Sequence, residues 1–124
     1  MRAKLRIFLG DITYDTIVLV SDTIPINIGF IASYIKKTYG DKVDITLFKY
    51  PNDIINEIKS NPPDVIGLSN YSWNSNLSEF LASLAKKCNP NVVTFQGGTN
   101  FPHDDETQKT FLLKRPATDI FAIL

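Results

Sequence analysis

The sequence contains few residues that could cross-link it or bind a metal by themselves. Among its 124 residues there is one cysteine, Cys88, and one histidine, His103. A single cysteine excludes an internal disulfide, a cysteine-rich zinc site and an iron–sulfur cluster held by this chain alone. A lone histidine beside acidic residues is more often a solvated or capping residue than a catalytic base. We therefore predict no catalytic residue and no metal ligand in this chain.

Excess charge and long apolar runs are also missing. Thirteen acidic and thirteen basic residues cancel, so the charge favours neither nucleic acid nor an anionic membrane as a partner. The longest apolar runs are about as long as one strand, and the start shows no signal-peptide core. We expect a cytoplasmic protein without a membrane or nucleic-acid partner. A chain of 124 residues that is 44% hydrophobic can form one domain with its own core.

Apolar segments of strand length alternate with segments of helical periodicity along the whole chain. This alternation predicts an α/β fold in which a parallel sheet is covered by helices on both faces, a three-layer α/β/α arrangement. Five strands favour the flavodoxin-like (Rossmann-like) order 2-1-3-4-5. We expect strands at 4–9, 43–48, 65–68, 91–96 and 119–124, and helices at about 22–39, 51–61, 76–88 and 104–114.

Local signals refine two of these helices. The first is expected to begin at Asp22 or Thr23, with Pro25 in its first turn. Its buried face is expected to carry four isoleucines at helical spacing, Ile24, Ile28, Ile31 and Ile35.

The third helix opens with Asn76-Leu-Ser-Glu79. This spacing resembles a capping box, in which Glu79 reaches back to the first turn. Its apolar stripe is expected to consist of Leu77, Phe80, Leu81, Leu84 and Cys88, with the cysteine as a small core residue.

Three irregular stretches, 10–23, 69–74 and 97–103, follow the first, third and fourth strands. In the predicted order these strand ends lie side by side, at the edge where open parallel sheets bind their ligands. The pair Gly97-Gly98 is either a flexible turn or a place where a bulky ligand approaches the backbone. Tyr71 and Trp73 are either wall packing or ligand contacts.

Several familiar ligand motifs are absent from this edge. Only Gly10 follows the first strand, so a Gly-x-Gly-x-x-Gly dinucleotide loop is missing, and so is a P-loop. The third strand ends in Ser69-Asn70 rather than in the aspartate of a phosphoacceptor domain. Two alternatives from other classes stay open: a flavodoxin-like regulatory or interaction domain without a cofactor, and a small nucleotide- or flavin-binding protein.

Three segments carry a family resemblance that covers essentially the whole chain. They are Asp22-Thr-Ile-Pro-Ile-Asn-Ile-Gly-Phe-Ile-Ala, Pro62-Pro-Asp-Val-Ile-Gly-Leu-Ser69, and Gln96-Gly-Gly-Thr99. In this order and spacing the chain resembles the cobalamin (B12)-binding domain at the N-terminus of B12-dependent radical S-adenosylmethionine enzymes.

The resemblance implies that cobalamin binds at the carboxyl edge of the sheet. The corrin ring would lie over this edge, and the dimethylbenzimidazole nucleotide tail would insert between strand ends, where Ser69 would contact it. Gly97 and Gly98 would leave room for the tail, so we expect valine at either position to block binding while the fold stays intact. The cofactor-binding residues implied in this way are Tyr14, Asp22, Thr23, Gly29, Ser69, Asn70, Tyr71, Gly97, Gly98 and Thr99.

Two departures from related families limit what the resemblance implies. The Asp-x-His-x-x-Gly motif whose histidine ligates cobalt is missing, because no histidine precedes His103. We therefore predict that no protein imidazole ligates the cobalt.

The three-cysteine motif of radical enzymes is missing too, so S-adenosylmethionine and a [4Fe-4S] cluster would belong to a parent enzyme. We expect residues 1–124 to be a cobalamin module excised from such a parent, which would carry a downstream radical S-adenosylmethionine domain and act as a methyltransferase or a related enzyme.

Overall fold

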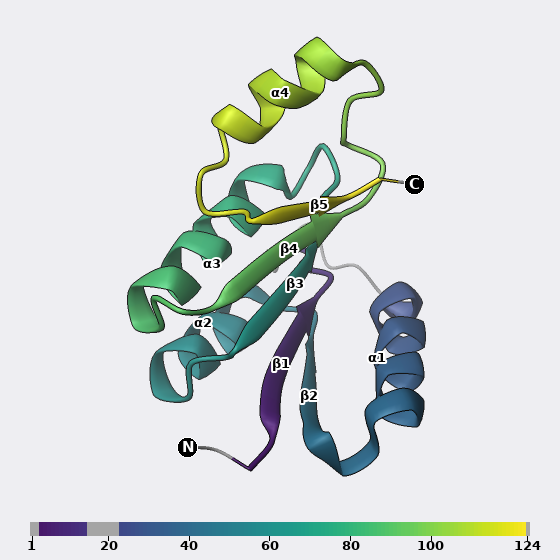
Figure 1. Ribbon diagram of the computed structural model, residues 1–124, viewed down its shortest axis with the longest axis vertical. Coiled ribbons are helices and arrows are strands. Elements are labelled where there is room, and N and C mark those ends of the chain that lie inside the picture. The colour runs from purple at the N-terminus through teal and green to yellow at the C-terminus, as the bar shows by residue number, and fades with distance from the viewer. Residues whose placement is uncertain (1–2, 15–22, 124) are drawn as a thin grey trace.

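Five parallel strands form the centre of the molecule (Figure 1). A computed structural model of the chain describes residues 3–14 and 23–123. The sheet has the order β2-β1-β3-β4-β5, as the sequence predicts. The strands are β1 (Leu5–Gly10), β2 (Val43–Phe48), β3 (Val65–Ser69), β4 (Val93–Gly97) and β5 (Ile120–Ala122).

Helices lie on both faces of this sheet, which gives the predicted three-layer arrangement. Figure 1 shows α1 on one face, α2 and α3 on the other, and α4 beyond β5 at the end of the sheet. The helices are α1 (Ile26–Tyr39), which leads into the short 3-10 helix η1 (Gly40–Lys42), α2 (Pro51–Ser60), α3 (Ser75–Cys88) and α4 (Asp105–Leu113).

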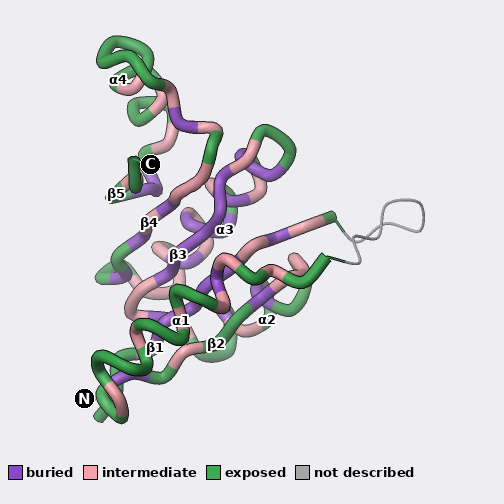
Figure 2. The backbone as a smooth tube through the Cα atoms, turned by 90° about the vertical axis from the view of Figure 1, so that its right-hand side faces the viewer, coloured by how far each residue is buried: buried purple, intermediate pink, exposed green. Residues whose placement is uncertain are grey.

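Alternation along the strands creates two hydrophobic cores. Phe8 points toward α2 and α3 and packs with Ile54, Ile66 and Leu81 in the larger core. The neighbouring side chains of β1 belong to the smaller core under α1, which consists of Ile7, Leu9, Ile28 and Val43. In Figure 2 the central strands β1 and β3 are largely buried. Burial of a large aliphatic or aromatic side chain contributes about 1.5–3 kcal/mol, so these two layers stabilise the sheet from both sides.

The helix α1 begins later than the sequence predicts. It starts at Ile26 with Pro25 as its N-cap, so the expected start at Thr23 is wrong; Asp22 lies outside the described residues. Ile24 is 83% exposed and Ile31 is 44% exposed, so neither belongs to the buried face that the sequence predicts. The residue before a proline is driven out of the helical region by the proline ring, which explains why the helix cannot include Ile24.

The start of α3 also differs from the prediction. The helix begins at Ser75 after Asn74, and the structure gives Asn74 no side-chain capping bond. Glu79 does not reach back to the first turn; its carboxylate accepts from the backbone N–H of Ala117 at 2.9 Å and from Oγ1 of Thr118 at 2.7 Å. The capping box is therefore wrong, because a stronger set of donors lies in the segment before β5.

The apolar stripe of α3 agrees with the prediction except at one position. Leu81 is fully buried, and Leu77, Leu84 and Cys88 pack against the larger core. Phe80 is 52% exposed and lies outside the stripe. Ala82 and Ala85 are buried instead, because their small side chains let the helix approach the sheet closely.

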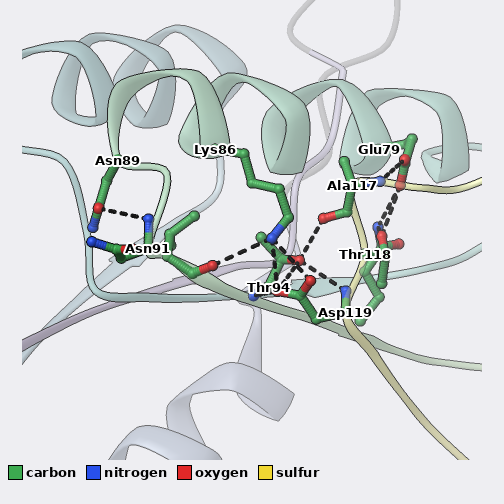
Figure 3. A network of polar contacts seen from close by, with 10 residues as sticks. Glu79, Lys86, Asn89, Asn91, Thr94, Ala117, Thr118 and Asp119 are labelled. Atoms are coloured by element: carbon green, nitrogen blue, oxygen red, sulfur yellow. Dashed lines mark hydrogen bonds and ion pairs between the residues drawn. The ribbon is translucent and has the colours of Figure 1, made fainter.

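A carboxylate fastens β5 to β4 and α3. Asp119 accepts from Nζ of Lys86 at 2.8 Å and from the backbone N–H of Thr94 at 2.9 Å (Figure 3). Burial by itself would raise the pKa of Asp119, but the hydrogen bonds from Lys86 and Thr94 outweigh it and hold the pKa below its usual value. The ionised form of Asp119 therefore stabilises the fold.

This pKa gives stability a defined pH dependence. Because the pKa of Asp119 is lower in the folded than in the unfolded chain, its contribution is complete above the unfolded pKa, about 3.9. It is lost as the pH falls through the folded value. Urea unfolding should show Asp119→Asn less stable than wild type at pH 7, with the gap closing below about pH 4. Asp44→Asn, at an exposed position of β2, is the control. A gap that stays constant down to pH 2 would contradict this assignment.

Candidate functional site

Side chains from three separate chain segments meet at the carboxyl edge of the sheet. Oγ of Ser69 donates to Oδ1 of Asp11 at 2.6 Å, which joins the end of β3 to the loop after β1. Nδ2 of Asn100 donates to Oδ1 of Asn70 at 2.8 Å, which joins the loop after β4 to the same strand end. The convergence predicted for the three irregular stretches is confirmed for the residues that the structure describes.

A cavity of about 260 Å³ lies at this edge, between α1 and the sheet. A complete small ligand usually occupies roughly 300–1,000 Å³. This cavity therefore suits a mostly apolar part of a larger ligand. Its walls are largely apolar and come from Leu9, Asn27, Ile28, Ile31, Gly67, Leu68, Ser69, Tyr71, Phe95, Gly97, Gly98 and Ala122.

Two other hollows differ in position. The first, of about 640 Å³, lies between α1 and β2 and is lined by Lys4. Because Lys4 precedes β1, this hollow does not lie at the carboxyl edge. The second, of about 180 Å³, adjoins the cavity at Gly98 and is lined by Thr99, Phe101 and His103 among others.

The cavity is shaped by the contact between Gly67 and Phe95. A Cβ atom added at Gly67 would overlap the ring of Phe95, so the ring lies directly over the bare backbone of β3. Sequence reasoning missed this pair. An isolated glycine inside an apolar strand is a signal for such a close approach, and it could have pointed to Gly67.

Gly97, which ends β4, and Gly98, which follows it, have different roles. At Gly97 an added Cβ would meet only Cβ of Ala122, at 3.4 Å, which is an ordinary contact. At Gly98 the backbone has a φ of +143°, and an added Cβ would overlap the carbonyl oxygen of Asn70. The fold itself therefore requires glycine at Gly98, and the expectation that valine there leaves the fold intact is wrong. Gly97 lines the cavity without being needed for packing.

Some of the sequence-predicted site residues lie together and others do not. Ser69, Tyr71, Gly97 and Gly98 line the cavity, whereas Thr99 lines the adjoining hollow beside His103. The side chain of Asn70 is fully buried behind the cavity. Tyr14 and Thr23 are exposed on either side of residues 15–22, and Asp22 lies outside the described residues. Gly29 is on α1 next to Ile28 but does not itself line the cavity.

An aromatic pair stands at the rim of the cavity. The rings of Tyr71 and Trp73 are stacked, with centroids 4.6 Å apart and planes 10° from parallel. Tyr71 lines the cavity, while Trp73 is 60% exposed. Trp73 is therefore not wall packing, and it presents an aromatic surface beside the opening.

Sequence reasoning missed the polar residues that hold this edge in place. Asp11 fixes the hydroxyl of Ser69, and Gln96, fully buried in β4, accepts from Nδ2 of Asn70. A buried amide in an otherwise apolar strand needs partners, so Gln96 carried a usable signal.

The residues that the structure describes contain neither a cluster of metal ligands nor a membrane-spanning helix. Within residues 3–14 and 23–123 no group of three or more His, Cys, Asp and Glu side chains is arranged to hold a metal ion. None of the helices described by the structure is both long enough and apolar enough to cross a bilayer.

Comparison with known proteins identifies the family. The sequence profile of the B12 binding domain matches residues 12–122, and the chain belongs to this family. Over 60 residues the chain is 38% identical to the cobalamin-dependent radical SAM methyltransferase TokK of Streptomyces tokunonensis. This match covers 48% of the chain but only 8% of TokK, so the chain spans a small part of that relative.

Two solved structures share the fold at low sequence identity. A cobalamin-binding protein from Desulfitobacterium hafniense superposes with a TM-score of 0.60 at 15% identity, over 97% of this chain and 53% of that one. The pilus assembly protein CpaE from Caulobacter crescentus superposes with a TM-score of 0.58 at 13% identity, over 95% and 80%. At these identities the likeness shows the fold alone.

The different roles of the two glycines can be tested by stability. Gly98→Ala should lower the free energy of unfolding by roughly 1–3 kcal/mol, because alanine there is strained and overlaps Asn70. Gly97→Ala should change it by about 0.5 kcal/mol or less. Urea denaturation of both variants measures this difference. Equal losses for the two variants would show that the fold does not distinguish these positions.

Proposed function

We propose that this chain binds cobalamin, with the dimethylbenzimidazole base of its nucleotide tail in the cavity between α1 and the sheet. The observation that carries the proposal is the cavity's apolar lining at the carboxyl edge of β3 and β4. Membership of the B12 binding domain family supports cobalamin as the ligand.

The residues present fit this part of the cofactor. A benzimidazole base is flat and largely apolar, and it would pack between Ile31 of α1 and the sheet side chains Phe95 and Ala122. Gly97 adds no side chain to the space that the base would fill. The corrin macrocycle is too large for about 260 Å³, so it would lie outside, over the carboxyl edge near the rim pair Tyr71 and Trp73.

Histidine, whose imidazole could ligate cobalt, is not among the residues that line the cavity. His103 is the only histidine of the chain, and it lines the hollow beyond Gly98 rather than the cavity. When bound, cobalamin supplies a cobalt centre that can carry a methyl group. In this proposal the protein holds the tail and the macrocycle, and the cobalt receives no nitrogen ligand from the chain.

We further propose that the chain serves as the cofactor module of a radical S-adenosylmethionine enzyme that transfers a methyl group. The match to a cobalamin-dependent radical SAM methyltransferase supports this role. S-adenosylmethionine and the [4Fe-4S] cluster would be bound by a partner domain, because the single Cys88 cannot hold a cluster alone.

Cobalamin binding can be followed by the fluorescence of the tryptophan and by the visible absorbance of the corrin. Trp73 is the only tryptophan and stands beside the cavity, so hydroxocobalamin should quench its fluorescence and the visible corrin bands should co-elute with the chain in gel filtration. Gly97→Val should weaken binding at least about tenfold, because its side chain fills the space for the base. Thr46→Val, at an exposed position of β2, should bind as wild type does.

Two results would contradict the proposal. If the corrin does not co-elute with the folded wild-type chain, the fold is shared with proteins of other function, as CpaE illustrates, and cobalamin binding is wrong. If cobalamin binds but folded Gly97→Val binds equally well, the tail does not enter this cavity.

The absence of a protein imidazole on cobalt has a spectroscopic test. Electron paramagnetic resonance of the bound Co(II) form should be the same in wild type and His103→Ala, since no histidine precedes His103 and the loop after β1 therefore offers no imidazole to the cobalt. Superhyperfine splitting from a nitrogen ligand that disappears in His103→Ala would refute the prediction and make His103 a cobalt ligand.

A further inference from the structure

A series of hydrogen-bonded polar side chains runs through the interior from α3 to the turn after β4. It consists of Glu79, Thr118, Gln96, Asn70 and Asn100. Gln96 and Asn70 are fully inaccessible to solvent. We call this series the amide chain.

The direction of every hydrogen bond in the amide chain follows from Glu79. An ionised carboxylate only accepts, and Glu79 accepts from the hydroxyl of Thr118 at 2.7 Å (Figure 3). A hydroxyl has one proton, so the oxygen of Thr118 is left to accept from Nε2 of Gln96, at 2.7 Å. Oε2 of Glu79 lies 3.5 Å from the same nitrogen. The amide nitrogen of Gln96 must therefore face Glu79.

The same logic fixes the orientation of the next two amides. With its nitrogen facing Glu79, Gln96 turns its oxygen toward Asn70, whose Nδ2 donates to it. Oδ1 of Asn70 is then turned outward, where it accepts from Nδ2 of Asn100 at 2.8 Å. A reversed amide at any step would place two acceptors or two donors against each other in the interior. Among the described residues, no buried side-chain nitrogen or oxygen lacks a hydrogen-bond partner.

The outer end of the amide chain holds the turn beside the cavity. The backbone N–H of Asn70 donates to the carbonyl of Gly97 at 2.7 Å, and the N–H of Asn100 donates to the carbonyl of Asn70 at 3.4 Å. Together with the side-chain bond from Asn100, these contacts fix the backbone on both sides of Gly98. Because Gly97 and Gly98 line the cavity, the position of this turn determines the width of the space for the base.

We propose that Glu79 is a positioning residue for the cobalamin site. It touches no ligand; through Gln96 and Asn70 it sets the orientation of the 98–100 turn, and so the affinity for the nucleotide tail. This inference rests on the proposed function. A purely structural role for the amide chain makes a different prediction, because it would lower stability without affecting the tail selectively.

The nearly isosteric substitution Glu79→Gln separates the two roles. A carboxamide at position 79 can donate as well as accept, so the orientations of Gln96 and Asn70 are no longer fixed. We expect the affinity for cobalamin to fall about tenfold, since a hydrogen bond or two at the turn is lost. The affinity for cobinamide, a corrinoid without the nucleotide tail, should not change.

Lys86→Met is the matched control. Lys86 lies on α3, as Glu79 does, but it does not belong to the amide chain, and its substitution removes the ion pair with Asp119 before β5. It should lower stability while leaving the ratio of cobalamin to cobinamide affinity as in wild type.

A second substitution can restore the hydrogen bonds of the amide chain, with donors and acceptors exchanged between positions 79 and 70. Asn70→Asp alone places a carboxylate against the oxygen of Gln96 and should weaken cobalamin binding. In the double variant Glu79→Gln/Asn70→Asp the carboxamide at position 79 can donate to Thr118, whose hydroxyl donates to Gln96, which donates to the carboxylate at position 70. All partners are again matched at the same net charge. The double variant should therefore bind cobalamin within about threefold of wild type, better than either single variant.

Hydrogen exchange gives a second readout that needs no ligand. In the free protein, the N–H of Asn100 should exchange faster in Glu79→Gln and return to its wild-type rate in the double variant. Additive losses in the double variant, equal losses for cobalamin and cobinamide, or an unchanged exchange rate at Asn100 in Glu79→Gln would each overturn the positioning role. If wild type binds no corrinoid while exchange behaves as expected, the amide chain positions the turn and the cobalamin proposal is the part that fails.

Discussion

The burial of Asn70 is the constraint on which the carboxyl edge of this sheet depends. This side chain is inaccessible to solvent, and leaving one of its polar groups unpaired would cost about 1–3 kcal/mol. Its amide is therefore matched on one side by Gln96 and on the other by Asn100. Its backbone also forms hydrogen bonds with the backbones of Gly97 and Asn100. One residue thus joins the end of β3, the end of β4 and the turn that follows.

This constraint separates the glycines of the edge that the fold requires from the one that it does not require. Gly98 lies against the carbonyl of Asn70, and Gly67 lies under the ring of Phe95, so both are required by contacts within the chain. Gly97 has no such contact closer than 3.4 Å. Its missing side chain leaves space in the cavity rather than in the core. A glycine that packing does not require, at the edge where parallel sheets bind ligands, supports the proposal that a ligand enters this space.

Much of the fold could be predicted from the sequence because its signals are local. The apolar run Val65–Leu68 and the alternation over Val43–Phe48 gave strands at the right positions, and the β-α order led to the observed sheet. The start of α1 was misplaced because a local rule, the restriction on the residue before Pro25, was not applied. The capping box was wrong because a partner distant in sequence outweighs a local pattern. The spacing of Asn76 and Glu79 resembles a capping box, but the donors that Glu79 binds are 38 and 39 residues away. No local rule could find them.

The sequence predicted which segments form the site better than it predicted the role of each residue in them. The three loops meet as expected, because strand order alone places their ends together. The roles within them depend on dihedral angles and contacts: Gly98 on its φ of +143°, Asn70 on its buried partners, and Ser69 on its bond to Asp11. None of these can be inferred from residue type and spacing.

The central claim is that the nucleotide base of cobalamin occupies the cavity between α1 and the sheet. Intermolecular nuclear Overhauser effects in the diamagnetic Co(III) complex test it most directly. If the base lies there, the benzimidazole ring protons will show contacts to the methyl groups of Ile31 and Ala122, which both line the cavity. A bound cobalamin whose benzimidazole protons show contacts only to residues outside the cavity lining would contradict it.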